Sequence, residues 1–90
     1  MLGKGNNLMI SGKKPPVKYY RIGEVVQYSG ISRQTVHNYT VMGLIREQLW
    51  TQGGHRLYGE DVFTRLEEIM SMRQKSLSLA EIRKALLATG

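Results

Sequence analysis

The first regular pattern of apolar residues begins near Tyr20 and has the period of a helix. Ile22, Val25 and Val26 stand at positions i, i+3 and i+4, which places them on one face of a short amphipathic helix. Gly30 interrupts the pattern, because glycine is unfavourable inside a helix and common in turns. The chain therefore predicts a short helix that ends at this glycine.

A second short helix is predicted directly after this turn. Ser32 is a suitable N-cap, since its hydroxyl can accept a hydrogen bond from a backbone N–H about three residues further on. Val36 and Tyr39 face inward from the segment that follows, and Gly43 stands where a left-handed residue ends a helix. Two short helices joined by a turn that contains glycine are typical of a helix-turn-helix.

The stretch from residue 44 to 58 has the character of a β-hairpin. The segments LIREQLW (44–50) and HRLY (55–58) predict two short strands. Gln52-Gly53-Gly54 supplies a flexible tip between them. A small hairpin is therefore expected directly after the second helix.

Helical spacing returns in the last third of the chain, where we expect two further helices. The first runs from Glu60 to about Arg73, and the second begins after an S-x-x-E capping box. The predicted fold is therefore mostly α: a helix-turn-helix, a short β-hairpin and two further helices. The residues that define the last two helices are Val62, Leu66, Ile69 and Met70 in the first, Ser78 and Glu81 in the capping box, and Leu79, Ile82 and Leu86 in the second.

Residues 1–18 show neither a helical nor a strand pattern. They contain three glycines and the Pro15-Pro16 pair, which oppose regular structure. We expect this segment to be a disordered basic leader, whose lysines either act as an arm on DNA or form an inert tail. Residues 19–90 are expected to form one folded domain.

The net charge of +6 is distributed unevenly. Residues 1–58 contain eight basic and two acidic residues, and residues 59–90 contain five of each, so the whole excess lies in the first part. A concentrated positive field suits a partner that is a polyanion, because neutralised phosphates release counterions. The alternative is a basic surface that is only solvated.

Several other classes of protein have little support in the sequence. The absence of cysteine excludes disulfides and cysteine-bound zinc, and two histidines without metal-binding spacing make a metal site unfavourable. Glu67 and Glu68 are neighbours and point about 100° apart on a helix, so they form no catalytic pair. We therefore expect no enzyme activity and no cofactor. No apolar run could span a membrane, and we expect a cytoplasmic, nucleoid-associated protein.

The exposed face of the second helix carries side chains that can read DNA bases. Arg33 can bind guanine O6 and N7, and Gln34 and Asn38 can bind adenine N6 and N7. His37 lies one helical turn after Arg33, on the same face. In a helix-turn-helix the first turns of the second helix lie in the major groove. The alternative is that these residues only face solvent.

Four blocks in a fixed order carry a family resemblance. They are Tyr20-x-Ile22-Gly23-Glu24; Gly30-x-Ser32 with Thr35, Tyr39 and the Gly43-Leu44 turn; Gly54-x-Arg56-x-Tyr58; and Leu79-x-Glu81-Ile82-Arg83. Residues 19–87 thereby resemble the DNA-binding domain of the mercury-resistance-regulator (MerR) family. The resemblance implies a winged helix-turn-helix, with the second helix in the major groove and Arg56 and Tyr58 of the wing on phosphates. It also implies a regulator that bends and untwists promoter DNA.

The chain departs from the family pattern at several positions. His37 and Trp50 stand where the family usually has arginine, Thr40 stands where it has an acidic residue, and the proline after the Gly-Leu turn is absent. Family regulators normally continue into a long dimerising helix and an effector domain. The chain is therefore expected to be either a small stand-alone regulator or part of a longer protein.

The preferred interpretation is a sequence-specific transcriptional regulator that binds double-stranded DNA. Further candidate partners are RNA polymerase and a second copy of the chain, as a homodimer or head to tail on DNA. An excisionase-like or architectural DNA-bending factor and a protein-interaction adaptor are the alternatives. Trp50 is expected either to pack the hairpin against the body or to lie along the sugar backbone. The residues expected to contact DNA are Arg21, Ser32, Arg33, Gln34, His37, Asn38, Trp50, Arg56 and Tyr58.

Overall fold

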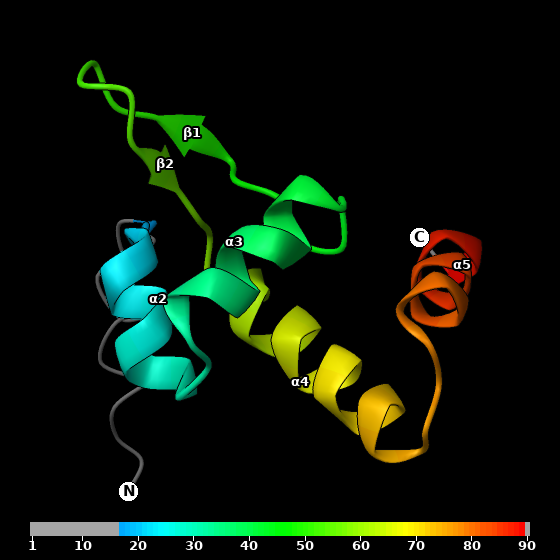
Figure 1. Cartoon of the computed structure of the whole chain (residues 1–90). Coiled ribbons are helices and arrows are strands. Elements are labelled where there is room, and N and C mark those ends of the chain that lie inside the picture. Colours follow the sequence, from blue (N-terminus) through cyan, green and yellow to red (C-terminus); the bar gives the residue numbers. More distant parts are fainter. Residues whose placement is uncertain (1–16, 90) are drawn as a thin grey trace, which may run out of the picture.

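The chain folds in the element order that its sequence predicts (Figure 1). The computed structural model describes residues 17–89, so Met1–Pro16 of the expected leader lie outside the described residues. Helices α2 and α3 are followed by a two-stranded hairpin and by helices α4 and α5. The bounds are α2 Ile22–Ser29, α3 Arg33–Val41, β1 Leu49–Trp50, β2 Arg56–Leu57, α4 Asp61–Gln74 and α5 Leu79–Thr89.

The turn between α2 and α3 is held by the residues that the sequence singles out. Gly30 adopts a left-handed φ of 75°, and its N–H donates to the Val26 carbonyl at 2.9 Å. The Ser32 hydroxyl accepts the Thr35 N–H at 3.2 Å, which confirms the predicted N-cap. Gly43, with a φ of 81°, turns the chain after α3. These local signals determine where both helices of the helix-turn-helix begin and end.

The hairpin is shorter than predicted. Strand β1 contains only Leu49–Trp50 of the segment expected over 44–50, and it pairs antiparallel with β2. Leu44 and Ile45 are instead buried in the core, at 3% and 4% exposure, because the Gly43 turn directs them there. The loop between the strands closes through the Thr51 N–H, which donates to the His55 carbonyl at 2.9 Å.

A backbone pair that the sequence does not predict joins the N-terminal segment to the hairpin. The Tyr20 and Tyr58 backbones exchange two hydrogen bonds, each 2.8 Å long, next to the end of β2. The predicted second strand over 55–58 therefore divides between two partners: Arg56 and Leu57 pair with β1, and Tyr58 pairs with the segment before α2. This pairing connects the start of α2 to the hairpin.

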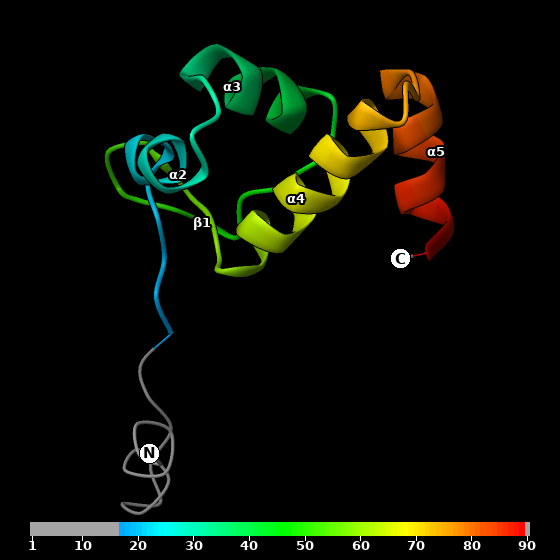
Figure 2. The same ribbon diagram turned by 90° about the horizontal axis from the view of Figure 1, so that it is seen from below.

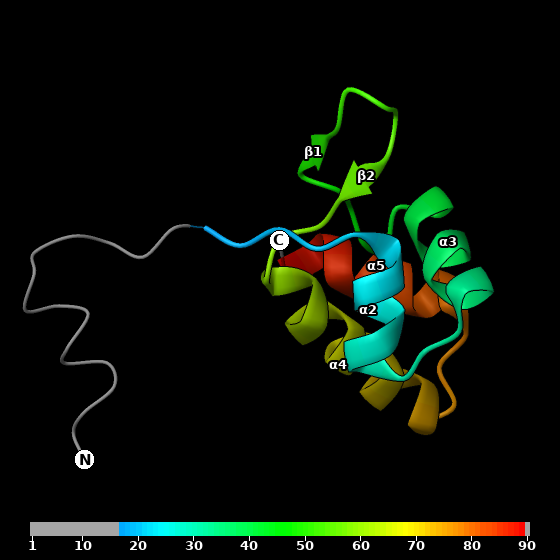
Figure 3. The same ribbon diagram turned by 90° about the vertical axis from the view of Figure 1, so that its left-hand side faces the viewer.

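Helix α4 lies at the centre of the helical layer and contacts both α2 and α5, which lie at opposite ends of the molecule (Figure 2). The hairpin stands out from the helices (Figure 3). The inward positions predicted for α4 are correct except at Met70, which is 39% exposed. The buried core consists of Val25, Val36, Tyr39, Leu44, Ile45, Tyr58, Val62, Leu66, Ile69, Ile82 and Leu86.

The predicted capping box at the start of α5 is present and makes this helix sensitive to pH. The Ser78 N–H donates to Glu81 Oε1 at 2.8 Å, and the Glu81 N–H donates to the Ser78 hydroxyl at 3.1 Å. Hydrogen bonds from Ser78, chiefly from its backbone N–H, lower the pKa of Glu81 below its ordinary value of 4.5. The folded protein thus favours the ionised carboxylate.

We expect the first turn of α5 to loosen on acidification. The pKa of Glu81 is lower in the folded protein than in the unfolded chain. The ionised Glu81 carboxylate therefore stabilises the helix fully above pH 4.5, and this stabilisation is lost as the pH falls through the folded pKa. NMR chemical shifts of residues 79–83, recorded between about pH 6 and about pH 3, should move toward coil values. Glu81→Gln should remove this pH dependence. An equal change in the Gln variant would contradict the assignment to Glu81.

Candidate nucleic-acid interface

The start of α2, the start of α3 and the hairpin meet around one hollow, which we call the basic hollow. Arg33 and Arg56, two of the residues that the sequence predicts to contact DNA, both line it, and their contact with DNA stays a prediction. Glu24 is the one acidic residue among its lining residues, against three arginines. The lining consists of Arg21, Ile22, Gly23, Glu24, Gln27, Arg33, His37, Gly54, His55, Arg56 and Tyr58.

The helix ends increase the positive potential of this hollow. Arg21 is the N-cap of α2, and Arg33 is the first residue of α3. Both helices therefore present their N-terminal backbone N–H groups and the positive end of the helix dipole near the hollow. The first turn of α3 contains no acidic residue that would offset this field. The site has the electrostatics that favour an anion such as a phosphate.

Arg33 lies close to α2. Its Nη2 atom is 3.6 Å from the point where a Cβ on Gly23 would stand. The guanidinium thus rests against the first turn of the neighbouring helix and faces the basic hollow. Contact between α2 and α3 therefore sets the position of a residue that is expected to reach DNA.

Gln34 and Asn38 lie on the exposed face of α3 and hold each other. The Gln34 Nε2 group donates to Asn38 Oδ1 at 2.9 Å across one helical turn. Both residues line a second hollow, together with Arg73 from α4. His37 lines both hollows and is exposed. The predicted base-reading face thus continues into the basic hollow through His37.

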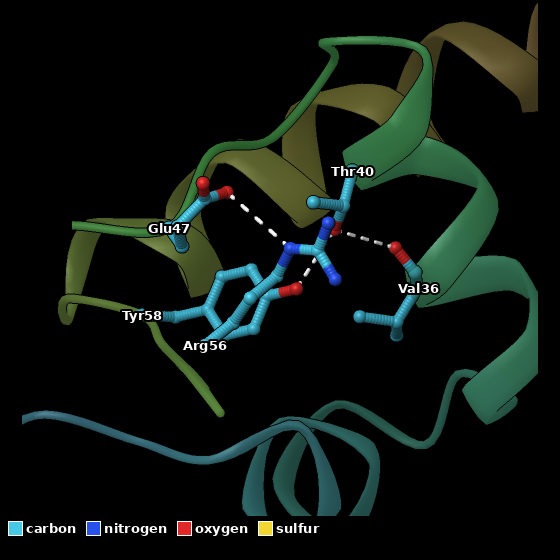
Figure 4. Close-up of polar contacts among 5 residues, drawn as sticks. All are labelled: Val36, Thr40, Glu47, Arg56 and Tyr58. Carbon is cyan, nitrogen blue, oxygen red and sulfur yellow. Dashed lines mark hydrogen bonds and ion pairs between the residues drawn. The ribbon is translucent and has the colours of Figure 1, made fainter. Parts of the chain in front are cut away.

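The hairpin holds Arg56 between an aromatic ring and a carboxylate. Its guanidinium carbon is 4.7 Å from the Trp50 ring centre, and its Nε atom is 3.7 Å from Glu47 Oε1. That Nε atom is shielded from solvent and has no hydrogen-bond partner, because 3.7 Å is too long for a hydrogen bond. Figure 4 shows Arg56 beside Glu47 and near the Tyr58 ring. Arg56 is therefore a weakly paired cation.

Trp50 is not packed against the helical body. Its side chain is 54% exposed, so that part of the prediction is wrong. Trp50 stands opposite Arg56 in the strand register, and its ring contacts this arginine instead. A contact between the indole and DNA stays a prediction.

The prediction that Tyr58 binds a phosphate is wrong for this structure, because its side chain has no exposed surface. Thr40 uses its own proton to bond the Val36 carbonyl at 2.9 Å, so the Tyr58 hydroxyl donates to Thr40 at 2.8 Å (Figure 4). The strand period correctly places Tyr58 on the same side as Arg56, but that side packs against α3 at this position.

The remaining predicted residue, Ser32, has a structural role. Besides capping α3, its hydroxyl donates to the Thr35 hydroxyl at 2.9 Å. A phosphate contact by its remaining acceptor position stays a prediction. Sequence reasoning missed Glu47 and Arg73, which reach the site only through the hairpin register and through the packing of α4. Neither residue belongs to a local motif that could have indicated its place.

Two further findings concern the part of the chain that the structure describes. Within residues 17–89, no group of three or more metal-ligating side chains comes together. No helix within those residues has the length and apolar character needed to cross a membrane.

The fold and the site define a winged helix-turn-helix protein, in which the hairpin is the wing. The MerR HTH family of regulatory proteins matches residues 20–89. The chain belongs to this family.

Relatives and solved structures agree with this assignment. The nodulation protein NolA of Bradyrhizobium elkanii is 36% identical over 80 residues, which cover 89% of this chain and 36% of that protein. The mercuric resistance operon regulatory protein of Bacillus cereus is 36% identical over 67 residues, or 74% of this chain and 51% of that protein. The chain thus spans about a third to a half of these relatives.

The crystal structure of MtaN, the N-terminus of a Bacillus subtilis multidrug transporter activator, superposes with a TM-score of 0.71. It is 31% identical in sequence, and the match covers 74% of this chain and 63% of that one. A MerR-family transcriptional regulator from Bacillus cereus superposes with the same score at 28% identity, over 78% of this chain and 52% of that one. The predicted winged helix-turn-helix is thereby confirmed.

Tyr58→Phe separates a structural role of the hydroxyl from a role in binding. The variant loses one buried hydrogen bond, so we expect the free energy of unfolding to fall by about 1 kcal/mol. Affinity for duplex DNA should stay within about twofold, because the buried hydroxyl makes no contact with DNA. The loss of a contact that contributes about 1.4 kcal/mol would instead weaken binding about tenfold. Thermal unfolding and gel-shift titration measure the two effects. Tyr28→Phe, at a side chain that is 63% exposed, is the matched control and should change neither. Unchanged stability with tenfold weaker binding would restore a phosphate contact to Tyr58.

Proposed function

We propose that the chain binds double-stranded DNA with sequence preference and serves as the DNA-binding unit of a transcriptional regulator. The observation that carries the proposal is the convergence of Arg21, Arg33 and Arg56 on one hollow beside the exposed face of α3. The three cations outnumber the carboxylates near them, which are Glu24 in the lining and Glu47 beside Arg56, so the hollow keeps a positive charge that attracts an anion. Regularly spaced phosphates on a duplex meet this requirement.

In the proposed complex α3 enters the major groove and the wing lies on the flanking backbone. Arg33 would bind a guanine edge, and the Gln34–Asn38 pair would present amide groups to adenine. Arg21 and Arg56 would contact phosphates on either side of this helix. His37, between the two hollows, would face the groove. Base contacts would provide the specificity, and phosphate contacts would provide most of the affinity.

The proposal also covers the partners and location of the protein. Relatives named as an operon regulatory protein and a transporter activator support a role at promoters, where RNA polymerase is the natural further partner. Two copies would bind paired half-sites, as a homodimer or head to tail on repeats. A regulator of this kind would work at the nucleoid in the cytoplasm.

Selection of binding sites from random duplexes tests the proposal. The wild-type chain should enrich one sequence, and the spacing of its half-sites would give the stoichiometry. Binding should weaken as salt rises, with a slope of about 0.9 per phosphate contact. Failure to enrich any sequence, together with binding that does not depend on salt, would reject the proposal.

Replacing Arg33 and Gln34 together by alanine should remove sequence preference at their positions. We expect affinity for the selected site to fall at least about tenfold, because each bidentate base contact contributes about 1–3 kcal/mol of discrimination. Binding to unrelated duplexes should fall much less. The control is Gln74→Ala with Lys75→Ala, which removes one amide and one cation from exposed positions at the end of α4. Base reading by α3 would be contradicted if the Arg33/Gln34 variant lost as much affinity for unrelated duplexes as for the selected site. It would also be contradicted if the Gln74/Lys75 control lost as much affinity for the selected site.

A further inference from the structure

We infer that Trp50 is a positioning residue for the wing: its indole holds the Arg56 guanidinium in place while a DNA phosphate replaces Glu47 as the partner of that arginine. The inference rests on the proposed function and deepens it. It assigns a role to Trp50, for which the sequence left two roles open, and to Glu47, which no sequence motif indicates.

The first support is the geometry of the cross-strand pair. Trp50 and Arg56 are direct partners in the register of β1 and β2, so their side chains emerge side by side on one face of the hairpin. The guanidinium carbon lies 4.7 Å from the ring centre, within the range of a cation–π contact. Such a contact restricts a long side chain that would otherwise lose rotamer freedom on binding.

The second support is the weakness of the pair between Arg56 and Glu47. The separation of 3.7 Å allows Coulomb attraction but no hydrogen bond, and the Nε atom has no other partner. The two side chains are 35% and 23% exposed, so solvent screens the attraction. A phosphate can accept two parallel hydrogen bonds from one guanidinium, which is a stronger arrangement. The exchange of carboxylate for phosphate is therefore favourable.

The third support is the position of Arg56 relative to the rest of the site. Arg56 lines the basic hollow together with Arg21 and Arg33, whereas Trp50 does not line it. Trp50 thus contacts the Arg56 guanidinium without being part of the hollow's lining. This is the arrangement of a support for Arg56 and not of another member of the cationic cluster.

A double-mutant cycle tests the role of Trp50. On the selected duplex we expect Arg56→Ala to weaken binding about tenfold or more, and Trp50→Ala to weaken it about two- to fivefold. Because Trp50 acts through Arg56, Trp50→Ala should have no further effect in the Arg56→Ala background. Trp50→Phe, which keeps an aromatic face, should restore most of the affinity.

The salt dependence provides a readout that a purely structural role would not change. The salt slope is the fall in log affinity for each tenfold rise in salt concentration. Trp50 carries no charge, yet Trp50→Ala should lower this slope by up to about 0.9, toward that of Arg56→Ala, because the arginine loses its phosphate contact. Trp50→Phe should keep the wild-type slope. Circular dichroism checks that each variant folds. The inference would be overturned if the double variant lost affinity by the product of the two single losses while Trp50→Ala kept the wild-type salt slope. That result would show that the indole contacts DNA independently of Arg56.

Glu47→Gln tests the exchange of partners. Removing the competing carboxylate should raise affinity for the duplex about two- to threefold more than Glu67→Gln does, since an exposed ion pair contributes up to about 1 kcal/mol. Glu67→Gln makes the same change in net charge on an exposed face of α4. Equal gains in affinity in the two variants would overturn the exchange of partners.

The failure of the proposed function and the failure of this inference give different results. If the wild-type chain binds no duplex, the proposed function fails. If the wild-type chain binds but the binding-energy losses of Trp50→Ala and Arg56→Ala simply add in the double variant, only the inference fails.

Discussion

The whole arrangement depends on the burial of one side chain, that of Tyr58. Its backbone pairs with Tyr20 directly before α2, its hydroxyl donates to Thr40 on α3, and its own segment continues from β2 of the wing. Three parts of the chain that are separate in sequence are thus joined at one residue with no exposed surface. Buried hydrogen bonds of this kind contribute little net energy, but leaving one unmade is costly, so they hold a particular geometry.

This junction explains why the arginines converge. Arg21 directly follows Tyr20, and Arg56 lies two residues before Tyr58, so the backbone pair between the tyrosines brings both arginines to the same edge. The bond to Thr40 then sets α3, with Arg33 at its start, beside them. The three cations therefore lie where the fold requires and not where their own repulsion would leave them. The fold thereby maintains a site that is prepared for an anion.

Local signals in the sequence were sufficient for most of the fold. The Ser32 cap, the helix end at Gly30, the left-handed Gly43 and the Ser78–Glu81 capping box each act within a few residues, and all are present as predicted. The length of β1 and the burial of Tyr58 could not be predicted in this way. An apolar pair such as Leu44 and Ile45 suits a strand or a core equally well, and only the turn before it decides. Similarly, the period of a strand gives the side on which Tyr58 lies, but its burial depends on Thr40 and on the distant Tyr20.

Two neutral side chains shape the surroundings of Arg56. The Thr40 hydroxyl serves Tyr58 through a neutral hydrogen bond. Trp50 gives Arg56 an aromatic face and carries no charge that would repel it. Arg56 therefore has only the weak attraction of Glu47, so the wing offers a more available cation than an arginine held by a buried carboxylate would be.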